Sequence, residues 1–144
     1  MSQSWIFWSL LSAFFAGATA VLAKVGVTGV DSNLATAIRT TVILFFAWAI
    51  AFVTARPGAL ATLSGRTWVF LALSGLATGL SWLCYFRALQ LGQASQVAPV
   101  DKLSVVFVLI FAAIFLREPL TLRSGVGGLL IVAGAIVLAW KTGT

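Results

Sequence analysis

Ionisable and amide side chains gather in one short stretch of an otherwise apolar chain, FRALQLGQASQVAPVDKLS at residues 86–104. The stretch holds one Arg, three Gln, one Asp and one Lys. Charged side chains are costly in lipid and normally face protein or a watery cavity, where they can bind a charged or polar solute. We therefore interpret this stretch as the rim of an aqueous cavity that opens toward one side of a membrane.

The chain offers little for covalent or metal chemistry. It has no histidine, three acidic residues and a single cysteine, Cys84, which excludes an internal disulfide and any multi-cysteine metal site. Hydrolytic triads and histidine-based metal sites are also excluded by this composition. The sequence therefore predicts a protein that is not an enzyme and that carries no metal or cofactor.

The overall composition is that of a membrane protein. The 144 residues are 61% hydrophobic and 8% charged, and the mean hydropathy is +1.10, whereas soluble domains are about 25% charged. In a soluble protein the net charge of +6 would suggest nucleic acid. Here the basic residues flank or interrupt apolar runs, so they are better explained by membrane orientation, and we expect a lipid bilayer and no nucleic acid as partner.

Five apolar runs each approach the roughly 20 residues needed to cross about 30 Å of hydrocarbon. Turn-forming sequences such as ARPG and REPLT separate them. The predicted spans cover about residues 5–27, 34–55, 67–89, 96–116 and 124–140. The sequence thus predicts an all-α membrane protein, with residues 1–144 forming a single domain that is a bundle of five transmembrane helices.

The loop charges favour one orientation of this bundle. An odd number of spans puts the termini on opposite sides, and the side of the N-terminus carries Arg56, Arg66, Arg117 and Arg123. The other side has one unambiguous loop cation, Lys141, so the N-terminus is expected to be cytoplasmic. Four further cations lie close to that other face: Lys24, Arg39, Arg87 and Lys102. When they are included, the number of basic residues on the two sides changes from four against one to four against five. The orientation is therefore favoured and not settled.

Charged residues within the spans are the candidate cavity lining. With alternating helix directions, five of them fall in the same half of the membrane: Lys24, Arg39, Arg87, Asp101 and Lys102. For Lys24 and Arg87 the alternative is snorkelling, because long basic side chains reach an interface from a few residues' depth. Arg39 and the adjacent Asp101–Lys102 pair lie deeper, and we expect at least one of them to face a cavity.

A proline lies beside the acidic–basic pair. Pro99 removes a backbone donor and disfavours helical geometry at Ala98, so the fourth helix is expected to start or to kink there. Freed backbone groups at membrane depth persist only against protein or water. This helix break therefore fits the cavity interpretation.

The third span carries a polar stripe. Ser74, Thr78, Ser81 and Tyr85 are spaced four, three and four residues apart, which places them on one helical face. Ser81 and Tyr85 approach the level of the charged residues, and we expect them to contact solute. The alternative is plain helix packing, in which hydroxyl groups bond their own backbone carbonyls.

The chain resembles the EamA branch of the drug/metabolite transporter superfamily over nearly its whole length. The matching elements are Lys24 with Gly26, Arg39, YFRALQLGQASQVAPVDKLSVVF at 85–107, LREPLT at 116–121 and GGLLIVAGAIVL at 127–138. The chain is similar to the single-domain type of five helices, whereas most relatives have ten from two tandem copies. The resemblance implies export or exchange of small metabolites across the inner membrane, with a cavity between helices.

Three functions remain open. The first is a secondary metabolite carrier; the second is a non-transporting membrane subunit that packs against another protein. The third is a small cationic-drug exporter that relies on Asp101, because exporters of that type use a glutamate in the first helix, where this chain has Phe14 and Phe15. The proposed cavity is net positive, which suits an anionic or zwitterionic solute.

A five-helix chain has no internal inverted copy, yet many carriers move solute at the junction of two inverted repeats. We therefore expect a homodimer, either parallel or antiparallel. The last span is the expected interface, because Gly127 and Gly134 are seven residues apart on nearly one face and no charge lies between Arg123 and Lys141. The alternative is that these glycines only fit the helix against its own bundle.

Overall fold

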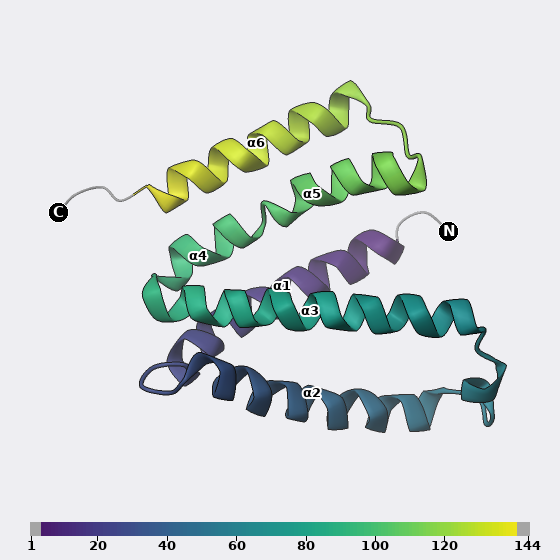
Figure 1. Cartoon of the computed structure of the whole chain (residues 1–144). Coiled ribbons are helices and arrows are strands. Elements are labelled where there is room, and N and C mark those ends of the chain that lie inside the picture. The colour runs from purple at the N-terminus through teal and green to yellow at the C-terminus, as the bar shows by residue number, and fades with distance from the viewer. Residues whose placement is uncertain (1–3, 141–144) are drawn as a thin grey trace. The chain divides into compact units, whose positions relative to one another are not determined.

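The computed structural model describes residues 4–140 of the chain, and within them the fold is helical throughout (Figure 1). Its elements in chain order are α1 (Ser4–Gly26), α2 (Ser32–Thr54), η1 (Ala59–Thr62), α3 (Gly65–Leu91), α4 (Ala94–Asp101), α5 (Ser104–Phe111), η2 (Ala112–Leu116) and α6 (Leu122–Ala139). Lys141, which entered the charge count above, lies outside the described residues.

Five helical segments are long and apolar enough to cross a membrane. They are α1, α2, α3, the continuous stretch from α4 to η2, and α6. The prediction of an all-α membrane protein with five spans is therefore confirmed. The bounds differ by a few residues from the predicted ones, and for α2 and α6 a side-chain cap fixes the first residue.

Local sequence explains where α2 begins. The Asp31 carboxylate accepts hydrogen bonds from the backbone N–H groups of Asn33 and Leu34, at 2.9 and 3.0 Å. An acidic N-cap satisfies donors that the first turn leaves without partners, and its charge opposes the positive end of the helix dipole. The helix consequently starts at Ser32, two residues before the predicted span.

The fourth span is interrupted, but not at Pro99. This proline lies inside α4, and the interruption falls at Lys102 and Leu103. The Lys102 N–H reaches both the Ala98 and the Pro99 carbonyl oxygens, and the Leu103 N–H reaches the Val100 carbonyl oxygen. Bonding to the third preceding residue tightens this turn. The helix thus tolerates Pro99 within its second turn, and the backbone adjusts three residues later.

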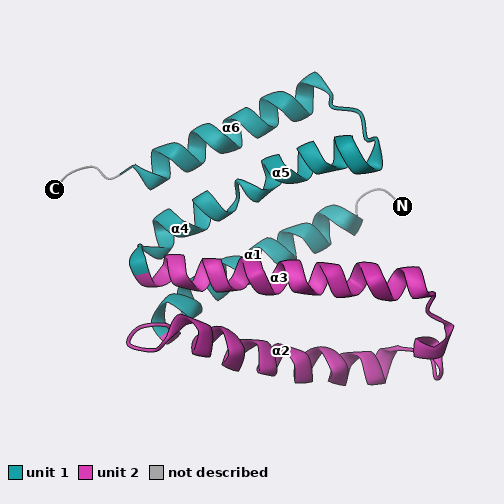
Figure 2. Ribbon diagram, viewed as in Figure 1, with its two compact units in different colours: residues 1–25, 91–144 teal, residues 26–90 magenta. Residues whose placement is uncertain are grey.

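The chain divides into two compact units (Figure 2), residues 1–25 with 91–144 and residues 26–90. In unit 1, α6 packs against α4 and α5. The buried Gly128 of α6 accommodates Leu109 of α5: a Cβ atom added at Gly128 would lie 3.3 Å from Leu109 Cδ1. A close approach of this kind is the usual role of small residues between membrane helices.

Unit 2 consists of the antiparallel helices α2 and α3 with η1 between them (Figure 2). Its buried residues lie near the N-terminal end of α2 and the C-terminal end of α3: Val27, Ser32, Thr36, Phe86 and Leu89. The buried Thr36 hydroxyl donates to the Ser32 carbonyl oxygen at 2.8 Å. Outward-facing aromatic and aliphatic side chains such as Phe45, Phe52 and Leu76 are 71%, 77% and 63% exposed, as expected for surfaces that face lipid.

Candidate solute-binding site

Arg39 lies on an aromatic platform provided by α3. Its guanidinium carbon is 4.3 Å from the centroid of the Trp82 ring and 5.5 Å from that of Phe86. Trp82 and Phe86 are four residues apart, so they share one face of α3. Both distances fall within the roughly 6 Å over which a cation is attracted to an aromatic face, an attraction of about 2 kcal/mol when desolvated.

This platform supports the charge of Arg39 without neutralising it. Among residues 4–140 the one ion pair joins Lys102 Nζ to Asp101 Oδ2 at 3.3 Å, so Arg39 has no carboxylate partner there. A guanidinium has its five N–H donors in its plane, and contact with a ring face leaves them directed outward. Arg39 is therefore a half-buried cation that can still donate hydrogen bonds to an anion.

Tyr85 joins Arg39 in this part of unit 2. Tyr85 is half-buried, and its ring centroid lies 6.5 Å from that of Phe86, over which Arg39 also lies. Ser81 is exposed, and farther along the predicted stripe the Thr78 hydroxyl donates to the Ser74 carbonyl oxygen at 2.9 Å. The Ser74–Thr78 end of the stripe thus makes the backbone contact expected of packing, whereas Tyr85 adjoins the cation.

Sequence reasoning missed Trp82 and Phe86. A signal was present, because Trp82 lies far inside its span rather than at an interfacial end, where tryptophan is enriched. It also has the helical spacing to share a face with the residues around Tyr85. Only the pairing of α2 with α3, which no local pattern encodes, identifies these rings as the partners of Arg39.

Arg87 is directed along its own helix. Its Nη1 donates to the Gln90 side-chain oxygen at 3.0 Å, and Gln90 Nε2 donates to the Val30 carbonyl oxygen at 2.5 Å. These bonds tie the end of α3 to the loop that precedes α2. Arg87 is exposed, and its contacts in unit 2 are those of a residue that orders a helix end.

The charged residues of unit 1 make contacts within that unit. Lys24 Nζ donates to the Gly92 carbonyl oxygen at 2.8 Å, which fastens the end of α1 to the turn before α4. Asp101 and Lys102 bind each other, and their side chains are 37% and 57% exposed. An exposed pair of this kind contributes little to stability, so neither residue is required by the packing of unit 1.

The α6 glycines separate into two kinds. A Cβ atom at Gly127 or Gly134 would meet nothing within 4 Å in the structure, whereas one at Gly128 would press on Leu109. Gly128 is therefore the glycine that fits α6 against its own unit. Gly127 and Gly134 leave a narrow surface on α6 that a further helix can approach.

The stripe on α3 gives a prediction about solute affinity. We expect Tyr85→Phe and Ser81→Ala to raise the KM of transport by about two- to tenfold, the range of one neutral hydrogen bond. Tyr85→Phe should have the larger effect, because Tyr85 is half-buried beside Phe86, over which Arg39 lies, whereas Ser81 is exposed. Uptake kinetics in liposomes measure this, with Ser74→Ala as the matched control two turns away. Unchanged KM values in both variants would identify the stripe as packing.

Comparison with known proteins agrees with this membrane architecture. Residues 3–140 match the model of the EamA-like transporter family. A protein from a Sinorhizobium species, described as an uncharacterized transporter in the cobO 3' region, is 58% identical over 139 residues, 96% of this chain and 99% of that protein. No solved structure matches the chain significantly.

A second relative is similar over about half of the chain. This Enterobacter protein, described as a probable 4-amino-4-deoxy-L-arabinose-phosphoundecaprenol flippase subunit ArnE, is 38% identical over 73 residues, 51% of this chain and 68% of its own length. With the family match across nearly every residue, these similarities identify the chain as a multi-pass membrane transporter. It belongs to the EamA-like transporter family.

Proposed function

We propose that this transporter is a secondary carrier that exports or exchanges a small anionic or zwitterionic metabolite across the inner membrane. The observation that carries the proposal is Arg39, held on Trp82 at 4.3 Å with no carboxylate partner among residues 4–140. A cation kept half-buried in a membrane span and left unneutralised is costly unless it serves a solute. A carboxylate or phosphate group would complete its interactions with charge-assisted hydrogen bonds.

In unit 2 the residues proposed to contact solute are Arg39, Ser81, Tyr85 and Arg87. In unit 1 they are Lys24, Asp101 and Lys102. The carrier works as a homodimer, because one five-helix domain lacks the second repeat at whose junction many carriers bind solute. In a parallel dimer both N-termini lie in the cytoplasm, the side that the loop cations favour. Gly127 and Gly134 of α6, where an added Cβ atom would meet nothing within 4 Å, support this assembly.

The alternative is a membrane subunit that acts only together with another protein. One observation favours it: the Enterobacter relative is described as a flippase subunit. In that case the purified chain would move no solute alone, although the same helices would pack against a different partner.

Flux through the purified full-length protein in liposomes tests the proposal. Solutes of similar size are compared as an anionic, a zwitterionic and a cationic set, with protein-free vesicles as the control. We expect uptake of anionic or zwitterionic members to be at least about tenfold faster than uptake of cationic ones, the equivalent of one charge-assisted hydrogen bond. Flux of cations alone would favour the drug exporter, and no flux of any solute would favour the subunit.

A further inference from the structure

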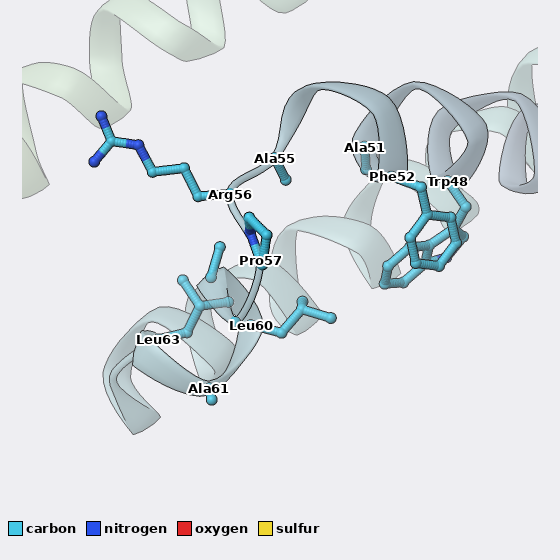
Figure 3. Close-up of a pocket in the computed structure, with 11 residues that line it drawn as sticks. Trp48, Ala51, Phe52, Ala55, Arg56, Pro57, Leu60, Ala61 and Leu63 are labelled. Carbon is cyan, nitrogen blue, oxygen red and sulfur yellow. The ribbon is translucent and has the colours of Figure 1, made fainter.

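An apolar groove of about 420 Å³ opens where α2 ends, within unit 2 (Figure 3). This volume falls within the roughly 300–1,000 Å³ of small-molecule sites. Aromatic and aliphatic residues line most of it, among them Trp48, Ala51, Phe52 and Leu60, and Arg56 contributes a charged side chain. The groove is separate from the surroundings of Arg39, and the function proposed above does not use it.

A tight turn builds the groove. Pro57 and Gly58 are the central residues of a turn that the Ala59 N–H closes onto the Arg56 carbonyl oxygen at 3.1 Å. Gly58 has φ 79°, as the third position of a type II turn requires. The turn directs η1 back alongside the last turns of α2. Leu60 then extends toward the side on which Phe52 and Trp48 lie (Figure 3).

The lining combines a hydrocarbon wall with one charge. Trp48 and Phe52 present adjacent rings, 5.5 Å apart between centroids, and the remaining lining residues apart from Arg56 are Ala, Leu, Pro and Gly. Arg56 is exposed, and its guanidinium extends away from these apolar side chains (Figure 3). A ligand that fits both features has an apolar chain and a negatively charged head.

The groove lies where such a ligand is abundant. It lies at the end of a membrane span, where hydrocarbon gives way to lipid headgroups. The loop between Arg56 and Arg66 contains no acidic residue, and Arg66 lies over the Phe70 ring at 5.7 Å. Basic residues at a membrane surface attract anionic lipids, whereas a water-soluble metabolite would find one charged side chain and little else to bind.

We propose that the groove between α2 and η1 is a binding site for an anionic phospholipid of the surrounding leaflet. One acyl chain lies against Trp48, Phe52 and Leu60, and the lipid phosphate accepts hydrogen bonds from the Arg56 guanidinium. The bound lipid anchors the loop between α2 and α3 at the membrane surface.

Native mass spectrometry of the full-length, delipidated protein tests this proposal. The protein is titrated with phosphatidylglycerol and, separately, with phosphatidylcholine of the same acyl chains. We expect the first phosphatidylglycerol to bind about tenfold more tightly than phosphatidylcholine, because the choline cation of the second lipid offsets the phosphate charge that Arg56 would bind. Arg56→Gln should remove this preference, whereas the matched control Arg66→Gln, at the start of α3 and outside the groove, should keep it.

A second pair of variants tests the apolar part of the groove. Ala51→Trp fills the groove and should weaken binding of both lipids, whereas Ala47→Trp, one turn earlier on α2 and outside the lining, should not. Equal binding of the two lipids by the wild-type protein would overturn the proposal. So would an Arg56→Gln variant that kept the preference, because Arg56 is exposed and its replacement leaves the fold intact.

Discussion

Arg39→Leu is expected to reduce transport of an anionic solute at least tenfold, while the protein still inserts and folds. A charged donor to a carboxylate or phosphate contributes about 1.5–3 kcal/mol, which corresponds to roughly 10- to 100-fold in binding. Leucine removes that donor and its charge and keeps an apolar side chain at this position of α2. The measurement is initial uptake into liposomes, with the amount of reconstituted protein and its melting temperature determined for each variant.

Two further variants separate the charge of Arg39 from its geometry. Arg39→Lys keeps the charge but loses the planar fork that can bind a carboxylate at two points, so it should give an intermediate rate. Arg66→Leu is the matched control, because Arg66 also lies over an aromatic ring, at 5.7 Å, yet belongs to the start of α3. Normal transport by Arg39→Leu would remove Arg39 from the proposed site and leave it a structural role.

The five spans and the fold class could be predicted because they depend on local properties. Span length and apolar composition decide which segments can cross hydrocarbon, whatever they pack against. The helix ends needed more detail: Asp31 starts α2, and a reciprocal pair of hydrogen bonds between Thr121 and Ser124 starts α6. Such caps are also readable from sequence, although hydropathy alone places the boundaries a few residues away.

The contacts of Lys24 and Arg39 could not be predicted in the same way. Both residues depend on a partner distant in the sequence, as when Lys24 donates to the Gly92 carbonyl oxygen, 68 residues away. Trp82 reads as one more apolar residue of its span until α2 brings Arg39 over its ring. The break near Pro99 shows a related limit. A proline predicts a weakened backbone, but neighbouring hydrogen bonds decide which residue absorbs the change.

Gly128 shows the same limit for glycine patterns. The seven-residue spacing drew attention to Gly127 and Gly134. The glycine that packs closely within unit 1, against Leu109, is instead Gly128, which is not part of that spacing. The spacing of glycines indicates that one face of the helix lacks large side chains. It does not indicate which helix packs on that face. The two kinds of glycine are nevertheless useful together, because their replacement should have different consequences.

Gly134→Leu is expected to weaken the proposed homodimer about tenfold or more without destabilising the single chain. A Cβ atom added at Gly134 would meet nothing within 4 Å and the position is exposed, so the chain itself has room for a larger side chain. A second helix packed closely on this face would be pushed away, since such interfaces depend on small residues that let backbones approach. A tenfold loss corresponds to about 1.4 kcal/mol. Crosslinking in native membranes and sedimentation of the purified protein in detergent measure it.

Two replacements on the same helix make this result specific. Ala133→Leu adds a similar side chain about 100° around the helix and should leave the dimer intact. Gly128→Leu should lower the melting temperature of the chain, because even its Cβ atom would press on Leu109 at 3.3 Å. Monomers alone in native membranes, under all crosslinking conditions, would contradict the homodimer. If crosslinks form, tags on the termini that react from only one side of the membrane would exclude the antiparallel arrangement and leave a parallel dimer.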